Sequence, residues 1–158
     1  MRPTAEHVRE ALLDMLGADV KDARVLDLFA GTGALGLEAL SRGARSADFV
    51  ELKPDSLHAL RANIASLRLR ERTRVFKRDA IPFAAALEPD SYDIAFADPP
   101  YGSRKLDRVL ESWRQSHFAR ILAVEHARTH HVPDGASRRV FEETVVTIFR
   151  ASGVRPRR

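Results

Sequence analysis

Residues 24–40, RVLDLFAGTGALGLEAL, decide the fold of this chain. The stretch begins with an apolar run over residues 25–29, whose length and bulk are typical of a buried parallel strand. It turns through Ala30-Gly31-Thr32-Gly33 and continues into apolar residues at helical spacing. A strand, a glycine turn and a helix in this order bring backbone N–H groups close to a nucleotide-like ligand.

Three glycines in this stretch, Gly31, Gly33 and Gly36, satisfy the pattern G-x-G-x-x-G. The pattern alone is weak, because glycines in a tight turn often serve only the turn. Asp27 is more informative, since it lies in the strand where a dinucleotide-binding protein brings a pyrophosphate close. A carboxylate there would repel a phosphate and favour a ligand that carries an ammonium or a sulfonium. The sequence therefore favours S-adenosylmethionine over NAD, and the alternative is that Asp27 only braces the turn.

The composition is typical of one globular domain. The chain has 158 residues, of which 44% are hydrophobic and 30% are charged. We expect a single domain over residues 1–151 and a basic tail over residues 152–158. No apolar run approaches membrane-spanning length, and the first ten residues lack the apolar core of a secretory signal. We therefore expect a cytoplasmic protein with no membrane association, and a monomer.

Cysteine and charge narrow the chemistry further. The absence of cysteine excludes disulfides, thiolate zinc sites and a cysteine nucleophile. The histidines show no spacing that forms a ligand set, so we expect no metal. The net charge of +4 is compatible with a polyanionic partner but does not demonstrate one.

Predicted strands and helices alternate along most of the chain. The strands are predicted at residues 25–29, 47–52, 74–77, 92–97 and 120–125, and the helices at 4–16, 35–42, 54–67, 81–87 and 105–115. Two β-rich runs within residues 138–149 follow without room for a helix between them, which predicts an antiparallel hairpin. This order predicts an α/β fold with a mostly parallel sheet and helices on both faces.

Acidic residues fall at or near the ends of four predicted strands, namely Asp27, Glu51, Asp79 and Asp98. The carboxyl ends of parallel strands meet along one edge of the sheet, where ligands bind in open α/β folds. Glu51 lies twenty residues after Gly31, where an acid can accept hydrogen bonds from ribose hydroxyls. The alternative for Glu51 is an exposed acid at the end of a strand.

The segment Asp98-Pro99-Pro100-Tyr101 is the most specific chemical signal in the sequence. Neither proline has an N–H to donate, so the segment cannot extend a strand ladder and leaves its carbonyl oxygens free to accept. Asp98 and the Pro99 carbonyl can accept the hydrogens of an exocyclic amino group on a planar base, while Tyr101 stacks on the ring. The alternative is a rigid loop at the end of a strand, with Tyr101 packed as a structural ring.

Together these motifs resemble the S-adenosylmethionine-dependent RNA methyltransferases that modify N2 of a guanine in small-subunit ribosomal RNA (the RsmD type). The resemblance covers most of the chain and is carried by RPTAEHVREALLDML, VLDLFAGTGALGLEALSRGA, FVEL, RDA and DPPY. DPPY alone looks like amino-methyltransferases in general, including adenine-N6 enzymes that act on DNA. The RPT helix ahead of the glycine unit narrows the resemblance to the RsmD type.

The resemblance implies a Rossmann-like class I methyltransferase, with a seven-stranded, mostly parallel sheet whose last strand is antiparallel. It implies S-adenosylmethionine as the cofactor, and ribosomal RNA or the small ribosomal subunit particle as the partner. The implied cofactor-binding residues are Asp27, Phe29, Ala30, Gly31, Thr32, Gly33, Glu51, Leu52, Asp79, Ala80 and Asp98. The implied catalytic residues are Asp98, Pro99, Pro100 and Tyr101, and the implied substrate-binding residues are Arg2, Pro3, Thr4 and Tyr101.

The sequence departs from the family pattern in two places. Family members usually carry a short basic hairpin ahead of the RPT segment, whereas this chain starts almost at that segment. Residues 141–144, FEET, stand where the family tends to have an aromatic-glycine turn, so we expect a different hairpin geometry. Three functional alternatives stay open: an adenine-N6 methyltransferase acting on DNA, a methyltransferase acting on a small amine, and an NAD-binding oxidoreductase or nucleotide sensor.

Overall fold

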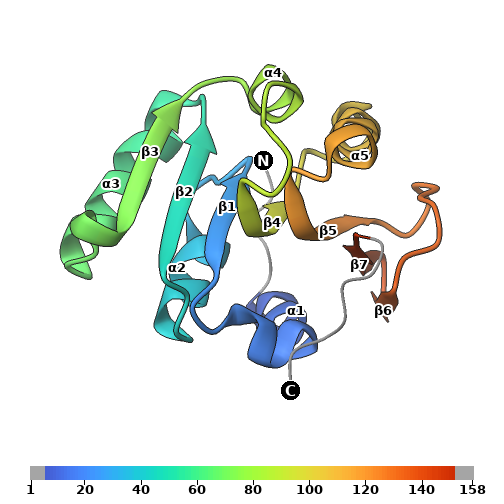
Figure 1. Ribbon diagram of the computed structural model, residues 1–158, viewed down its shortest axis with the longest axis horizontal. Coiled ribbons are helices and arrows are strands. Elements are labelled where there is room, and N and C mark those ends of the chain that lie inside the picture. Colours follow the sequence, from blue (N-terminus) through green and yellow to red (C-terminus); the bar gives the residue numbers. More distant parts are fainter. Residues whose placement is uncertain (1–5, 152–158) are drawn as a thin grey trace.

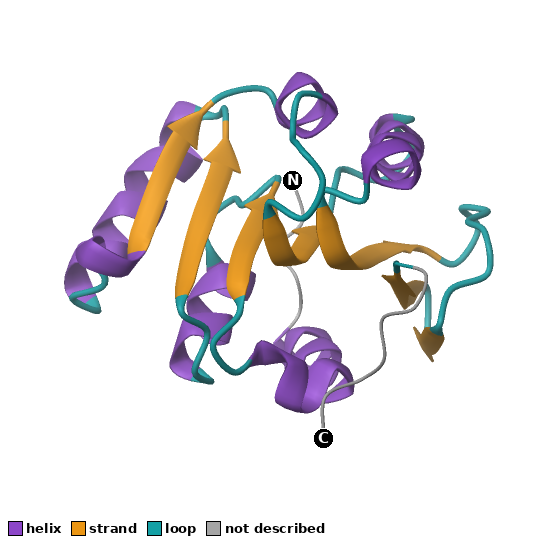
Figure 2. Cartoon of the chain, in the orientation of Figure 1, coloured by secondary structure: helices purple, strands orange, loops and turns teal. Residues whose placement is uncertain are grey.

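A seven-stranded sheet runs through the middle of the structure, with helices on both of its faces (Figure 1; Figure 2). The computed structural model describes residues 6–151. The strands lie in the order β3-β2-β1-β4-β5-β7-β6. Strand β1, which opens the glycine unit, is therefore near the centre of the parallel part of the sheet.

The elements follow the predicted alternation. The strands are β1 (Arg24–Leu28), β2 (Ser46–Glu51), β3 (Thr73–Lys77), β4 (Tyr92–Ala97), β5 (Ala119–Ala127), β6 (Ser137–Phe141) and β7 (Thr144–Arg150). The helices are α1 (Glu6–Leu16), α2 (Ala34–Ser41), α3 (Pro54–Ser66), α4 (Ala80–Ala85) and α5 (Lys105–Ser116), with short 3-10 turns η1 (Gly17–Val20) and η2 (Arg70–Arg72). The predicted start of the first helix at Thr4 lies outside the described residues.

The strand pairing confirms the predicted fold class. β1 pairs in parallel with β2 and β4, and the parallel pairs β2–β3 and β4–β5 extend the sheet on either side. β7 runs antiparallel to β6, because the β6–β7 turn is too short for a crossover helix, and it also runs antiparallel to β5. Strand β5 is longer than predicted, because its pairing with β7 continues to Ala127 opposite Thr144.

Two apolar layers hold the sheet between its helices. One layer joins the sheet to α1, α2 and α3, and the other joins it to α4 and α5. Helix α5 shows how one face is fixed: it buries Leu106, Val109, Leu110 and Trp113 against the sheet. The Trp113 indole N–H donates to the carbonyl of Ala119 at 2.7 Å, which satisfies its polar atom in the core.

Neither a membrane-spanning helix nor a cluster of metal ligands occurs within residues 6–151. None of the helices in that range is long and apolar enough to cross a membrane. Within the same range, no group of three or more His, Cys, Asp or Glu side chains could hold a metal ion.

Candidate active site

A cavity of about 290 Å³ lies at the carboxyl ends of β1, β2 and β3. Its lining consists of Phe29, Val50, Glu51, Leu52, Lys53, Pro54, Arg78, Asp79, Ala80, Pro100 and Lys105. The structure thus brings together Phe29, Glu51, Leu52, Asp79 and Ala80, five of the residues predicted to bind the cofactor. We call this space the donor cavity.

The glycine turn after β1 forms one wall of this region with an unusual backbone. Phe29, Gly31 and Gly33 have φ angles of 58°, 58° and 89°, in the left-handed region that favours glycine. For Phe29 this conformation is strained, and such strain is common at ligand sites. The N–H of Ala30 donates to the carbonyl of Val50 at 3.0 Å, which joins the turn to β2.

Close packing explains the glycines at positions 33 and 36. A side chain at Gly33 would clash with Leu60 of α3, and one at Gly36 would clash with Phe49 of β2. The glycines of the G-x-G-x-x-G pattern therefore serve two purposes: they form the turn, and they allow α2 to pack closely against the sheet. Within the turn, the carbonyl of Thr32 accepts a hydrogen bond from Asn63 Nδ2 at 3.0 Å.

Glu51 holds the turn through its carboxylate. Its two oxygens accept the N–H groups of Gly31 at 2.8 Å and Lys53 at 2.9 Å. The residue is only 6% exposed, so the alternative of an exposed strand-end acid is wrong. A carboxylate has about four lone-pair positions, so Glu51 keeps acceptor capacity for hydroxyl groups in the donor cavity.

Asp27 is buried behind the turn. It is 2% exposed, and its Oδ2 accepts the N–H of Gly36 at 3.0 Å. Burial raises the pKa of Asp27 to about 8; the Gly36 hydrogen bond opposes this rise, and the nearby charges of Asp98 and Glu51 add to it. The side chain therefore does brace the turn, as the alternative held. It also carries a proton that a nearby cation would displace.

Asp79 and Ala80 form the far side of the donor cavity. Asp79 is the N-cap of α4, and its side chain accepts the N–H of Ile81 at 3.0 Å. This cap fixes the first turn of α4 beside the cavity, where its apolar residue Ala80 is buried.

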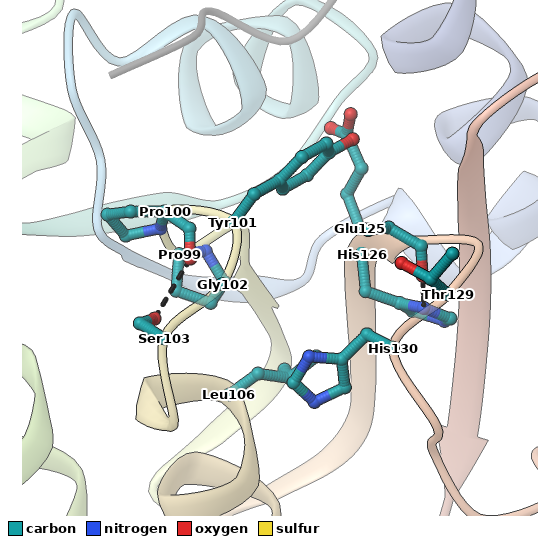
Figure 3. A pocket seen from close by; sticks show the side chains of 11 residues that line it. Pro99, Pro100, Tyr101, Gly102, Ser103, Leu106, Glu125, His126, Thr129 and His130 are labelled. Carbon is teal, nitrogen blue, oxygen red and sulfur yellow. Dashed lines mark hydrogen bonds between the residues drawn. The ribbon is translucent and has the colours of Figure 1, made fainter.

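A second cavity of about 200 Å³ lies on the other side of the DPPY segment (Figure 3). Its lining consists of Pro99, Pro100, Tyr101, Gly102, Ser103, Leu106, Glu125, His126, Ala127, Thr129 and His130. We call this space the acceptor cavity. Pro100 lines both cavities, so the DPPY segment is the wall that they share.

Tyr101 is exposed and anchored at its tip. The residue is 44% exposed, so its ring is not buried in the core. Its hydroxyl lies 2.7 Å from Oγ1 of Thr144 at the start of β7. The loop itself is braced by the Ser103 hydroxyl, which donates to the carbonyl of Pro100 at 2.9 Å. Tyr101 therefore presents an oriented ring face at the edge of the acceptor cavity.

Several predicted residues do not line either cavity within the described part of the chain. Asp27 is buried behind the donor cavity, Asp98 follows β4 close enough to raise the pKa of Asp27, and the glycine turn lies alongside. The predicted substrate residues Arg2, Pro3 and Thr4 lie outside the described residues.

Sequence reasoning missed the β5 side of the acceptor cavity, namely Glu125, His126, Thr129 and His130. One signal was available for Glu125, because it is an acid near the end of a buried strand, like Asp27 and Glu51. The histidines gave no comparable signal, since their contacts come from distant segments: His126 Nε2 lies 2.9 Å from Thr147 Oγ1, and His130 Nε2 lies 2.8 Å from Asp107 Oδ1.

The donor cavity fits S-adenosylmethionine. Phe29, Val50 and Leu52 form an apolar surface that an adenine ring could contact, and the Glu51 carboxylate among them could accept hydrogen bonds from ribose hydroxyls. The charge of Asp98 supplies negative potential for a sulfonium or an ammonium, and either cation would favour loss of the proton that Asp27 carries.

Known proteins are similar to this chain in sequence and fold. The model of a protein family described as Conserved hypothetical protein 95 matches residues 1–143. The putative rRNA methyltransferase YlbH of Bacillus subtilis (strain 168) is 33% identical over 138 residues, which are 84% of this chain and 75% of that protein. Ribosomal RNA small subunit methyltransferase D of Escherichia coli (strain K12) is 39% identical over 110 residues, or 70% of this chain. The aligned part is 54% of that relative, so the chain spans about half of its length.

Among solved structures, a putative methyltransferase yhhF from Escherichia coli superposes with a TM-score of 0.82 and 30% sequence identity. The superposition covers 95% of this chain and 87% of that chain. The likeness therefore extends over the whole sheet and its helices.

Proposed function

The chain belongs to the RsmD-type family of S-adenosylmethionine-dependent ribosomal RNA methyltransferases, described as Conserved hypothetical protein 95, and on this premise we propose that it methylates N2 of a guanine in small-subunit ribosomal RNA. One observation carries the proposal: Pro100 lines both the donor cavity and the acceptor cavity. A methyl donor in the first space and a base in the second would meet at the DPPY segment.

The donor cavity binds the cofactor. Glu51 accepts hydrogen bonds from the ribose hydroxyls, and Leu52, Asp79 and Ala80 flank the adenine. The glycine turn and Asp27 hold the methionine end. When bound, S-adenosylmethionine would supply an activated methyl group for N2; the electron pair of the broken C–S bond would stay on sulfur, and the displaced amino proton would leave to solvent.

The DPPY segment orients the acceptor. An aromatic amine is a weak nucleophile, because its lone pair is delocalised into the ring. Asp98 and the Pro99 carbonyl accept the two amino hydrogens and so turn the nitrogen lone pair toward the donor cavity. Tyr101 stacks on the base, and its bond to Thr144 keeps the ring in place. These residues act by positioning, which can supply a large part of the acceleration.

We also propose that the protein works in the cytoplasm as a monomer, on ribosomal RNA or a small-subunit particle. The net charge of +4 favours a polyanionic partner. The arginines contribute most of the positive charge and can contact phosphates around the site.

The test is methyl transfer from labelled S-adenosylmethionine to small-subunit particles that lack the modification. Nuclease digestion and mass spectrometry of the product should find N2-methylguanosine at one position. N6-methyladenosine in its place would contradict the proposal and support the adenine alternative.

Asp98→Ala gives the matching site test. Transfer should fall by at least about 100-fold, because the amino group loses an acceptor that orients it. Binding of S-adenosylhomocysteine, measured by calorimetry, should persist. Activity close to that of the wild type would show that the base binds elsewhere.

A further inference from the structure

Glu125 combines deep burial with a place beside the acceptor cavity. It is 1% exposed and is the one ionisable residue among the largest fully buried side chains of residues 6–151. A buried carboxylate is costly unless it makes strong hydrogen bonds, so its retention in a strand calls for a reason. The sequence around it, ILAVEHA, is otherwise mostly apolar.

The strand register places Glu125 next to the predicted base site. β4 and β5 pair in parallel, with Phe96 opposite Ala123 and Ala97 opposite Val124. Phe96 and Ala123 both pack in the apolar layer of α1, α2 and α3. Side chains alternate along a strand, so Glu125 points to that same side of the sheet, two residues beyond Ala123.

The close-up view agrees with this placement. In Figure 3 the Glu125 side chain rises from β5 toward the ring of Tyr101, and both residues line the acceptor cavity. The two histidines on this wall also contact the fold. His126 contacts Thr147 Oγ1 and the carbonyl of Ala127, and His130 contacts Asp107.

The chemistry of the bases separates guanine from the other amino-bearing bases at this position. In guanine the N2 amino group is next to N1–H, which is a second donor. In adenine the N6 amino group is next to N1, and in cytosine the N4 amino group is next to N3, both of which are acceptors. A carboxylate beside the amino site therefore binds guanine and repels adenine and cytosine.

We infer that Glu125 selects guanine by accepting the N1–H hydrogen bond of the target base, while Asp98 and the Pro99 carbonyl hold its N2 amino group. The inference rests on the proposed function, because it concerns the base that occupies the acceptor cavity. It also gives a physical reason why a DPPY segment that suits several amino groups acts on one of them here.

A substrate analogue tests this contact without any change in the protein. 2-Aminopurine keeps the amino group at position 2, has an acceptor in place of N1–H and lacks the 6-oxygen, and the Glu125→Gln variant separates the first difference from the second. Small-subunit RNA is prepared with guanine or 2-aminopurine at the mapped position, by ligation of a synthetic oligonucleotide, and is assembled into particles. The wild type should prefer guanine by about 10–100-fold in kcat/KM.

The Glu125→Gln variant reverses the chemistry at the same size, because its amide can donate to N1 of 2-aminopurine. The preference for guanine should fall to within about threefold of unity, since the 10–100-fold discrimination depends on the carboxylate. The ratio of two substrates within one variant cancels any loss of active protein. Glu71→Gln, the same change at an exposed position of η2 outside both cavities, should keep the wild-type ratio.

Each result has one meaning for the inference. Equal use of guanine and 2-aminopurine by the wild type overturns it, and this arm does not depend on the folding of a variant. An unchanged guanine preference in Glu125→Gln also overturns it, while methylation of guanine by the wild type leaves the proposed function intact. If the wild type transfers no methyl group to guanine, the proposed function and the inference fail together.

Discussion

Acidic residues in the amino halves of the parallel strands have different partners from those at the carboxyl ends. In the amino halves, acids are paired with arginines: Asp93 accepts from the Arg24 backbone N–H at 2.8 Å and from its guanidinium. Asp48 accepts two hydrogen bonds from Arg74, at 3.0 and 2.7 Å, and one from the Tyr92 hydroxyl at 2.7 Å. Burial would raise the pKa of Asp93, but the hydrogen bonds from Arg24 lower it below its usual value.

At the carboxyl ends, the described contacts of the acids are to backbone N–H groups and the acids lie close to one another. Asp27 and Glu51 accept from the glycine unit, and the charges of Asp98 and Glu51 help to raise the pKa of Asp27. One half of the sheet therefore pairs its acids with arginines, whereas the other places acids close together, which raises the pKa of Asp27. The difference separates residues that stabilise the fold from residues that serve the site.

The largest expected effect comes from the carboxyl end, through the proton on Asp27. The pKa of Asp27 is about 8 in the fold against 3.8 for the ordinary group, so between these values the native state holds a proton that the unfolded state has released. The free energy of unfolding should therefore fall as pH rises through this range, by up to about 1.4 kcal/mol per pH unit from this group.

Asp27→Asn should remove that slope, because an amide does not titrate and can still accept from Gly36. Urea unfolding of both proteins at pH 5 and pH 8, followed by circular dichroism, measures the difference between them. Parallel pH profiles for the wild type and the variant would show that the buried carboxyl is ionised throughout.

Substitutions of acids in the amino halves of the strands should lower stability without changing the affinity for the cofactor. Asp48→Ala leaves the buried Tyr92 hydroxyl without its acceptor and should lower the free energy of unfolding by about 1–3 kcal/mol. The affinity for S-adenosylhomocysteine, measured by calorimetry, should not change. Arg74→Gln is the milder control, because the Arg74 side chain is 70% exposed and its ion pair should contribute less than about 1 kcal/mol. A loss of cofactor affinity in Asp48→Ala would contradict the separation of the two halves.

The smallest effect should come from Asp79, which both caps a helix of the fold and lines the donor cavity. Asp79→Ala removes the N-cap of α4 and should cost about 1 kcal/mol of stability. Because the same residue lines the donor cavity, the cofactor should also bind more weakly. Asp79→Asn keeps a capping oxygen and should restore the stability. Unfolding and calorimetry on the two variants would separate these roles, and equal loss of stability in both would show that the cap does not contribute.

The sequence was sufficient for the parts of the molecule that local patterns determine. Short stretches of consecutive residues predict the glycine unit, each strand and helix, and the loop after β4. The order of these elements then predicts the fold class. The sequence could not decide between the two roles considered for Asp27. A carboxyl that braces α2 and a carboxyl that faces a ligand occupy the same position in the strand.

The acceptor cavity depends on contacts between distant segments. Tyr101 and Thr144 are 43 residues apart, and no periodicity indicates that they meet. Glu125 was within the predicted strand at residues 120–125, but its importance depends on the register between β4 and β5. A strand assignment gives the face of each residue only after the neighbouring strand is known.

The bond between Tyr101 and Thr144 also bears on how such enzymes diverge. The ring comes from the loop after β4, but its tip is tied to the first residue of β7. The preceding turn holds Glu142 at a φ of 52°, a conformation that favours glycine, so mutations there alter the backbone next to the anchor. Changes in this surface hairpin can therefore tilt the Tyr101 ring while the DPPY segment stays the same, and under the proposed stacking role such a tilt would alter which bases fit.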